Sequence, residues 1–552
     1  MQQVQKLIEV SQQDGLFRAT TAACLFNFNV SNSVLKYLQT SPDRTSRYDS
    51  LQRVSEVDFF ISHSWSCSLW MKRLALCHRL NLNLAIGSCV LAFLLAVLIL
   101  VLRAGSFPAV AQQDLTLRCC LLLFWPFSVF LGTYLFGHLL DCRKFWIDQV
   151  CVHPTNAEVK SQTLQAIPAF VAQSKQMLVI WDDTYWQRLW CIYEVAIWVK
   201  ASSAPQAIRF VPTWMPLWVL SSFALLTLVC FSVVGQVWCW EKGNWDSRLS
   251  YVASFMMIAV PATVAVPVGV GLPWFWLCMQ KLQKHKLMLS QMEHFDIRSA
   301  ECTVESDRKV IEEQILDLFD EALEPPVQVS FGADAADAAD AADAPLMSPE
   351  ALRDIRHITS YPTRDEILDQ FNTYVRGPLR ESVEASIGKE DFLPLNSCIA
   401  AVLPLVLGGF TVALGCDGRA DCELSASNWG YASVTEYMLG NAFINGIQGP
   451  VFWILTFPLG LRTSCLAARA FSSGIWQTLA GASMTAVVLT ACSFSSSFQS
   501  VLILVVIIKY STIWLGACVA SFAVELFAFW HLFFRNPVRH SSRSFVASVS
   551  KP

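Results

Sequence analysis

Residues 177–199 read MLVIWDDTYWQRLWCIYEVAIWV, and this stretch decides how the rest of the chain is interpreted. It opens with a short apolar run typical of a buried strand, and two carboxylates, Asp182 and Asp183, follow at once. The helix-length segment after them places Glu194 among apolar neighbours and four residues after Trp190, so both side chains share one helical face. A carboxyl group in such surroundings is costly unless it is paired or used, which makes Glu194 a candidate functional residue.

The composition indicates a membrane protein. The chain has 552 residues, of which 54% are hydrophobic and 15% charged, whereas soluble domains carry about 25% charged residues. The net charge of −4 gives no reason to expect nucleic acid as a partner, and the lipid bilayer is the partner that the composition predicts. The first residues, MQQVQKLIEVSQQDG, lack the apolar core of a cleavable signal peptide, so we expect the first membrane segment to direct targeting.

Eight apolar segments have about the length of a helix that crosses a bilayer. They lie at about 81–103, 117–140, 213–236, 250–278, 395–415, 443–463, 474–494 and 500–533. An even number of spans places both termini on one side, and the basic residues of one loop and of the tail predict that this side is cytoplasmic. These residues are Arg462, Arg469, Arg535, Arg539, Arg543 and Lys551.

Changes of composition along the chain define the predicted domains. One α/β domain is split by a membrane hairpin, a second hairpin follows it, and a helical region with the low-complexity linker DAADAADAADA precedes a four-span membrane domain. In chain order the parts are a cytosolic lead-in at 1–56, the split α/β domain at 57–80 and 141–211, transmembrane hairpins at 81–140 and 213–278, the cytosolic helical region at 279–394, the four-span domain at 395–534 and a basic cytosolic tail at 535–552.

Four strand-like runs alternate with helix-length segments in the split domain. The runs are 57–61, 144–148, 177–181 and 207–211. Their β-α-β-α order predicts a parallel sheet with helices on its faces. Helices are expected to begin at Thr155 and Thr363, because each is followed three residues later by a glutamate, as in a capping box.

Polar residues follow three of these runs. Ser62-His63-Ser64-Trp65 follows the first, Asp148-Gln149 closes the second, and Asp182-Asp183 follows the third. Ligands of open parallel sheets bind beyond the carboxyl ends of the strands, and Trp190 and Glu194 are expected near the same edge. An indole that stacks on a ring and a carboxylate that stabilises positive charge would suit a nucleoside or nicotinamide ring.

Each of these residues also has a plainer interpretation. Trp190 and Cys191 have the character of core residues, Ser62 and Asp148 can cap turns, and Glu194 could pair with Arg188 or Lys200. No metal site is predicted, because Cys151-x-His153 is a lone pair of ligand types and the first strand lacks the acidic pair that would hold magnesium.

Two further features lie in the membrane part. Cys416 and Cys422, in the polar sequence CDGRADC, are the two of the 19 cysteines that invite a disulfide. Glu525 and Lys509 fall within or near the last span, where an ionisable residue is a functional candidate.

Three motifs resemble, in their order, those of the Toll/interleukin-1 receptor (TIR) domain family. They are VDFFISHSW at 57–65, FWID at 145–148 and YWQRLWCIYE at 185–194. The WCxxE element is similar to that of plant TIR domains, and the Trp-Ile-Asp-x-x-Cys run resembles fungal heterokaryon-incompatibility domains. A TIR-like core followed by membrane spans is similar to the arrangement in large protist families.

The resemblance implies an α/β flavodoxin-like fold and, for those members that are enzymes, cleavage of NAD at the nicotinamide–ribose bond. It places Glu194 at the position of the essential catalytic acid and Trp190 near the nicotinamide. The remaining binding residues would be Ser62, His63, Trp65, Asp148 and Asp182. NAD would be a substrate, and no cofactor is implied.

Three functions stay open on these grounds. The first is a membrane protein with a cytosolic TIR-like signalling module that hydrolyses NAD through Glu194. The second is a non-catalytic TIR-like scaffold that associates with further copies of itself. The third is a channel or transporter with a regulatory TIR-like domain and with Glu525 on a polar path through the last four spans.

Overall fold

The chain folds into two compact units. The computed structural model describes residues 8–26, 45, 48–201, 207–242, 273–319 and 363–534, apart from residues 13, 303–304, 389, 417–421, 429, 471–478 and several between 489 and 511. The sheet unit comprises Met1–Cys67, Cys142–Phe210 and Met288–Ser386, and the membrane unit comprises Ser68–Asp141, Val211–Leu287 and Ile387–Pro552.

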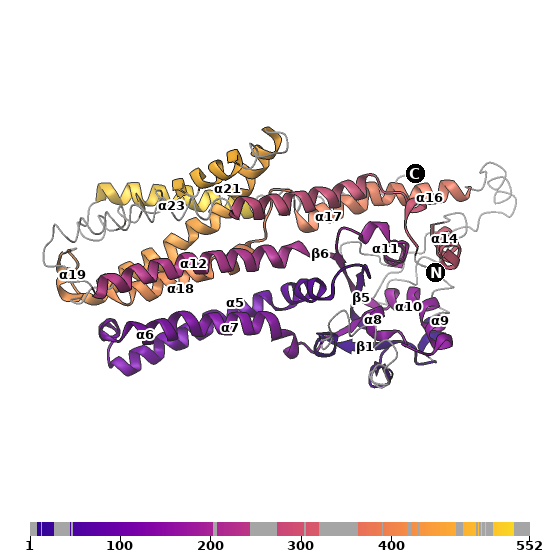
Figure 1. Ribbon diagram of the computed structural model, residues 1–552, viewed down its shortest axis with the longest axis horizontal. Helices are drawn as coiled ribbons and strands as arrows, with labels where there is room; N and C mark the ends of the chain where they lie inside the picture. The colour runs from indigo at the N-terminus through magenta and orange to yellow at the C-terminus, as the bar shows by residue number, and fades with distance from the viewer. Residues whose placement is uncertain are drawn as a thin grey trace, which may run out of the picture. The chain divides into compact units, whose positions relative to one another are not determined.

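The sheet unit is built on a six-stranded mixed sheet of order β2-β1-β4-β3-β5-β6 (Figure 1). Its strands are β1 (Arg18–Thr21), β2 (Gln52–Arg53), β3 (Val57–His63), β4 (Lys144–Trp146), β5 (Ser174–Trp181) and β6 (Ile208–Pro212). β3 runs parallel to both β4 and β5, as the sequence predicts. The expectation of a wholly parallel sheet is wrong, because β1 pairs antiparallel with β2 and with β4.

The three parallel strands form because each is a short apolar run that is buried from both sides. Phe60 pairs with Trp146 of β4, and their rings stack with centroids 4.7 Å apart. On the other side Ile61 pairs with Leu178 of β5. The alignment brings the polar residues that follow β3, β4 and β5 to one edge of the sheet.

Two of the described helices in the sheet unit, α9 and α16, begin at a side-chain cap. The helices are α2 (Ala22–Phe26), α8 (Asp148–Cys151), α9 (Ala157–Gln165), α10 (Ile167–Ala172), α11 (Leu189–Ala201), α14 (Glu305–Phe319), α16 (Arg364–Tyr374) and α17 (Arg380–Ile387). Thr363 and Glu366 form the predicted capping box at α16. The predicted start at Thr155 is wrong, because Asn156 caps α9 by accepting from the amides of Glu158 and Val159.

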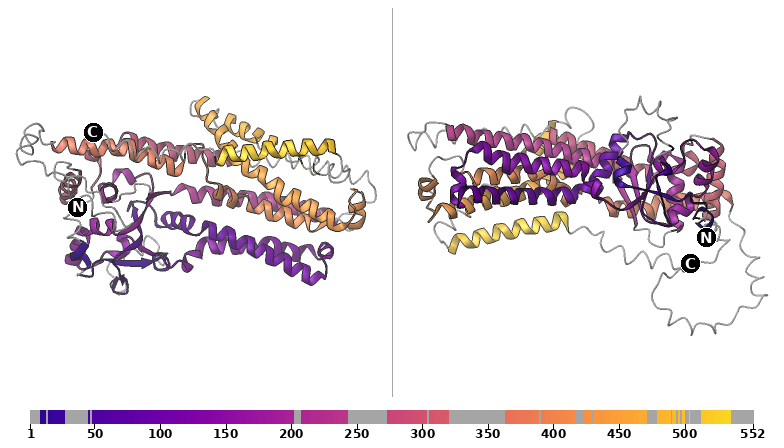
Figure 2. Two further views of the ribbon diagram at one scale, coloured as in Figure 1. Left: turned by 180° about the vertical axis from the view of Figure 1, so that it is seen from behind. Right: turned by 90° about the horizontal axis from the view of Figure 1, so that it is seen from below.

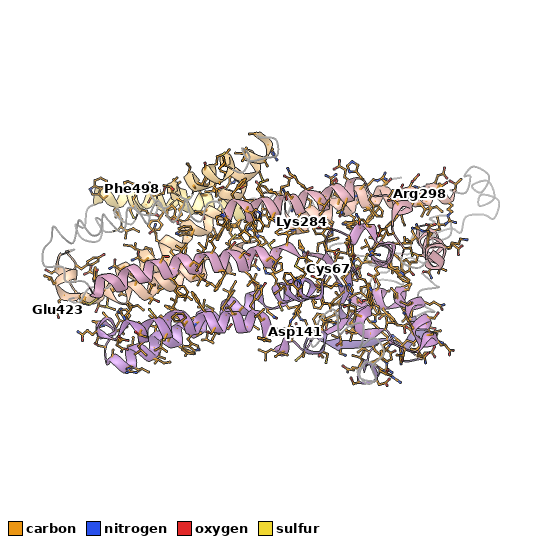
Figure 3. All side chains as sticks on the ribbon, viewed as in Figure 1. Cys67, Asp141, Lys284, Arg298, Glu423 and Phe498 are labelled. Carbon is orange, nitrogen blue, oxygen red and sulfur yellow. A yellow bond between two sulfur atoms is a disulfide. The ribbon has the colours of Figure 1, made fainter. Side chains whose placement is uncertain are left out.

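The segment after residue 287 completes the sheet unit. The amide of Leu189 donates to the carbonyl of Glu301 over 3.0 Å, and the ring of Phe295 meets that of Trp186 edge to face at 6.0 Å. The side chain of Arg298, labelled in Figure 3, forms ion pairs with Asp296, Asp365 and Asp369. Residues 288–386 therefore pack on the element that carries Glu194.

The membrane unit contains six helical segments that are long and apolar enough to cross a bilayer, counted over the described residues. They are Leu69–Ala104, Leu115–Leu140, Trp214–Ser232, Leu395–Ala413, Val434–Ala470 and Trp514–Phe533. Most of the predicted span at 250–278, and parts of those at 474–494 and 500–533, lie outside the described residues. These helices make the chain a multi-pass membrane protein.

The first two spans form an antiparallel hairpin, α5 (Leu69–Ala104) with α7 (Trp125–Phe136), which lie side by side in both views of Figure 2. The side chain of Asn81 donates to the carbonyl of Tyr134 over 2.9 Å, and Ser88 donates to Thr133 over 3.0 Å. Such interhelical hydrogen bonds hold helices together in lipid. The expected disulfide between Cys416 and Cys422 is present at the end of the fourth of these segments.

Candidate functional site

The carboxyl end of β3 supplies the centre of the site. Ser62 and His63 are the last two residues of the strand and pair with Val179 and Ile180 of β5. The chain leads from β3 to β4 on one side, and from β5 to β6 on the other side, so the strand order reverses between β3 and β5. Ligands of open α/β sheets bind at such a reversal point, beyond the carboxyl ends of the strands.

Glu194 meets Ser62 at this edge. It lies in the second turn of α11, and 7% of its surface is exposed. The hydroxyl of Ser62 donates to Oε2 of Glu194, and the same Ser62 oxygen lies 2.7 Å from the hydroxyl of Tyr185. Three side chains from β3, the loop after β5 and α11 thus form one buried hydrogen-bonded group.

The surroundings favour the neutral form of Glu194. Burial is the main reason that the pKa of this carboxyl lies well above its ordinary value, and the negative charge of Asp148 raises the pKa further. The hydrogen bond from Ser62 acts in the opposite direction.

Asp148 forms a second group with His63 and Trp65. Its Oδ1 lies 2.9 Å from Nε2 of His63, and the indole N–H of Trp65 donates to its Oδ2 over 2.6 Å. Burial by itself would raise the pKa of Asp148, but the interactions with His63, Trp65 and the amide of Gln149 outweigh burial and lower it. Asp148 is thus an anion, and 66% of the surface of Trp65 beside it is exposed.

Asp182 belongs to a third group of hydroxyl side chains. The Thr184 hydroxyl donates to Oδ1 of Asp182 over 3.1 Å and lies 2.8 Å from Oγ of Ser64 and 2.6 Å from Oγ of Ser66. This group links the loop after β3 to the loop after β5. Asp182 has a positioning role in the present arrangement.

Trp190 is half-buried, and its ring meets the ring of Tyr193 edge to face, with centroids 5.8 Å apart. The spacing of four residues places it one turn before Glu194 on α11. The residues that the sequence did not single out as binding residues are Tyr185, Ser64, Ser66 and Thr184. All four carry a hydroxyl group and lie in the loops that follow β3 and β5. Their residue type and their place after a strand could have identified them in the sequence as binding candidates.

The nearby cysteine and histidine residues, Cys191 and His153, have structural roles. Cys191 on α11 is buried, its thiol donates to the carbonyl of His63, and burial raises its pKa well above the ordinary value. His153 accepts from the backbone amides of Thr155 and Asn156, which is loop chemistry. Within the described residues, no group of three or more His, Cys, Asp or Glu side chains is arranged to hold a metal ion.

The cluster combines three groups whose chemistry suits a cationic or hydroxyl-rich ligand. It offers a neutral acid at Glu194, an anion at Asp148 and an exposed indole at Trp65. No family model, curated protein or solved structure matches the chain.

Proposed function

We propose that this multi-pass membrane protein carries a cytosolic TIR-like signalling module that hydrolyses NAD, with Glu194 as the essential acid. The observation that carries the proposal is the contact between Glu194 and Ser62 at the point where the strand order reverses. The order β4-β3-β5-β6, in which the second strand of the motif precedes the first, supports a flavodoxin-like fold of order 2-1-3-4-5 with its last strand missing.

The chemistry follows from the charge of the substrate. In NAD hydrolysis the bond between the nicotinamide nitrogen and ribose C1′ breaks, its electron pair passes to the nicotinamide, and water attacks C1′ and releases a proton. Positive charge develops on the ribose during this step, and a carboxylate stabilises it. The bound nicotinamide is itself cationic, and its charge would favour ionisation of Glu194.

The neighbouring groups have separate roles in this proposal. Trp65 and Trp190 offer indole rings for stacking, and Ser62 holds the Glu194 carboxylate in a fixed position. Asp148, held by His63 and Trp65, adds negative charge near the cationic ring. Trp65 is exposed in the loop after β3, whereas Trp190 is half-buried on α11. Because they lie on different elements, a flat ligand could stack on one of them without contacting the other.

A non-catalytic module is the second candidate function. It is favoured by the low exposure of Glu194, 7%, and by its hydrogen bond to Ser62, because a satisfied buried acid can be structural. In that case the sheet unit would act as a scaffold and associate with further copies of the same chain.

Turnover of NAD by the full-length protein in detergent or nanodiscs separates the two functions. We expect NAD consumption, with nicotinamide and ADP-ribose as products, and a loss of at least about 100-fold in Glu194→Gln. Glu158→Gln, at an exposed position of α9, is the matched control and should retain activity. Equally negligible turnover in the unmodified protein and in Glu194→Gln would exclude the enzyme and leave the scaffold.

The cytoplasmic placement of the sheet unit and of both termini is part of the same proposal. The basic residues Arg462 and Arg469 on the loop side of their span favour it. Labelling with a membrane-impermeant maleimide of single cysteines introduced near each terminus in intact cells would show no reaction until the membrane is opened. Reaction of either cysteine in intact cells contradicts this orientation.

A further inference from the structure

The last described membrane helix, α23 (Thr512–Phe533), exposes most of its apolar side chains and turns a few inward. The exposed residues are Trp514, Leu515, Val519, Val524, Leu526, Phe527 and Trp530. Cys518 and Glu525 are buried, and Ser521 and Phe522 between them are half-buried. These four have the spacing i, i+3, i+4, i+7 of one helical face, so the acid of this helix is directed away from lipid.

Two glutamines from other parts of the membrane unit meet this face. Gln448, at the end of the π-helical turn Ile444–Gln448, donates from its amide to Oε1 of Gln499 over 3.0 Å. Gln499 donates to the hydroxyl of Ser521 over 3.3 Å and also interacts with the carboxyl of Glu525. Both glutamines are almost fully buried. The polar groups thus form a chain between helices, and π-helical turns are frequent at functional sites.

Glu525 is incompletely satisfied by this chain. Its Oε2 atom is buried and has no hydrogen-bond partner among the described residues. Gln499 and Ser521 carry no charge, and Cys518 is the other titratable group on the same helical face. His531 is in the last turn of the same helix, and Lys509, which precedes the helix, lies outside the described residues. An ionised carboxylate at membrane depth with an unsatisfied oxygen is costly, so it requires a neutralising cation.

We propose that Glu525, positioned by Gln499, is a cation site within the membrane unit, at which a proton or a small monovalent metal ion neutralises the carboxylate. The site is separate from the Glu194 cluster and uses different residues. Proton and metal ion share the chemistry of the site, since either one compensates the charge at the free Oε2 atom.

Reaction with a hydrophobic carbodiimide tests this site, because the reagent modifies protonated carboxyl groups in apolar surroundings. The full-length protein in lipid nanodiscs is treated at a series of pH values, and modification of Glu525 is quantified by peptide mass spectrometry. We expect labelling at low pH that decreases about tenfold per pH unit once the group is mostly ionised. Glu436, a half-buried acid in the first turn of α20 (Val434–Phe443) whose carboxylate accepts from the amide of Ala432, should stay unlabelled, and Glu525→Gln should abolish the signal.

Two further measurements identify the cation and the role of Gln499: labelling in the presence of sodium or potassium ions, and labelling of the Gln499→Leu variant. Sodium or potassium ions that suppress labelling at fixed pH indicate a metal site, and labelling that responds to pH alone indicates a proton site. Gln499→Leu should shift the pH dependence toward higher pH, because a side-chain amide that donates to a carboxyl group favours its charged form. A purely structural amide would change thermal stability without moving that profile.

Other outcomes overturn the proposal. These are the absence of Glu525 labelling between about pH 5 and about pH 9, or labelling that is independent of pH over that range. Labelling that appears only in Lys509→Met would also overturn it, since Glu525 would then be neutralised by a lysine of its own chain.

Discussion

The hydroxyl of Ser62 donates to the carboxyl group of Glu194 across 132 residues of sequence that include a membrane hairpin. The contact joins the carboxyl end of β3 to α11, and Tyr185 touches the same serine oxygen at 2.7 Å. Because Ser62 has no exposed surface and Glu194 very little, the pair lies in the interior of the sheet unit. The arrangement of the site thus depends on the fold of the whole unit.

Ser62→Ala should destabilise the protein by about 1–3 kcal/mol, since it removes the donor to a buried carboxyl and leaves Tyr185 without this partner. The loss is measured as a decrease in the thermal unfolding midpoint of the purified protein. Ser161→Ala, at an exposed position of α9, is the matched control and should lie within about 0.5 kcal/mol of the unmodified protein. Equal stability of the two variants would contradict the contact.

Glu194 should make stability depend on pH in a defined direction. Its pKa in the folded protein is raised well above 4.5, chiefly by burial. The native state therefore retains a proton that the unfolded chain loses, so this contribution is complete at low pH and is lost as pH rises toward the folded pKa. The slope can reach about 1.4 kcal/mol per pH unit in that interval.

Glu194→Gln should remove this slope, because an amide does not titrate. The comparison is the change of unfolding midpoint with pH for Glu194→Gln, for the unmodified protein and for the exposed-site variant Glu158→Gln. The last two should lose stability in parallel above about pH 4.5. A Glu194→Gln variant that follows them closely would show that the acid is solvated.

The sheet core could be predicted from local patterns. β3 and β5 are short apolar runs that end in polar residues, and their parallel pairing puts Ser62 near the residues after Trp181. β1 and β2 could not be predicted, because their sequences, RATT and QR, contain no apolar run. β1 forms by pairing with β4, and β2 by pairing with β1, which are tertiary effects.

The helix caps show the limit of local rules. Thr363 with Glu366 satisfies the capping box on both sides, and α16 starts there. Thr155 with Glu158 has the same spacing, but the adjacent Asn156 is an equally good cap and starts α9 one residue later. In the site, the residue types at the strand ends were predictable, whereas the partner of each side chain depends on register and on helix placement.

Asp148→Asn should lower the pKa of Glu194, because the negative charge of Asp148 contributes to its elevation. The pH-dependent loss of stability should then stop at a lower pH than in the unmodified protein. Asp14→Asn, at an exposed position, leaves the field at Glu194 unchanged and is the control. The measurement is again the unfolding midpoint as a function of pH.

The same substitution weakens the contacts of His63 and Trp65, which approach the two oxygens of Asp148. An overall stability loss of about 1–3 kcal/mol is therefore expected in addition to the altered slope. If the slope above about pH 4.5 stays unchanged while stability falls, Asp148 acts only as a hydrogen-bond partner and exerts no field at Glu194.

Phe295→Ala should destabilise the sheet unit by about 3–5 kcal/mol, because it creates a cavity where Phe295 packs against Trp186, which precedes α11, and against Phe371 of α16. The Phe295 ring is buried and meets Trp186 at 6.0 Å and Phe371 at 5.9 Å. Val310→Ala on α14 is the control, since 52% of Val310 is exposed and its loss should cost less than about 0.5 kcal/mol. Limited proteolysis distinguishes the two variants, with faster cleavage after residue 287 expected for Phe295→Ala alone. Unchanged cleavage would mean that residues 288–386 contribute little to holding α11, and hence Glu194, in place.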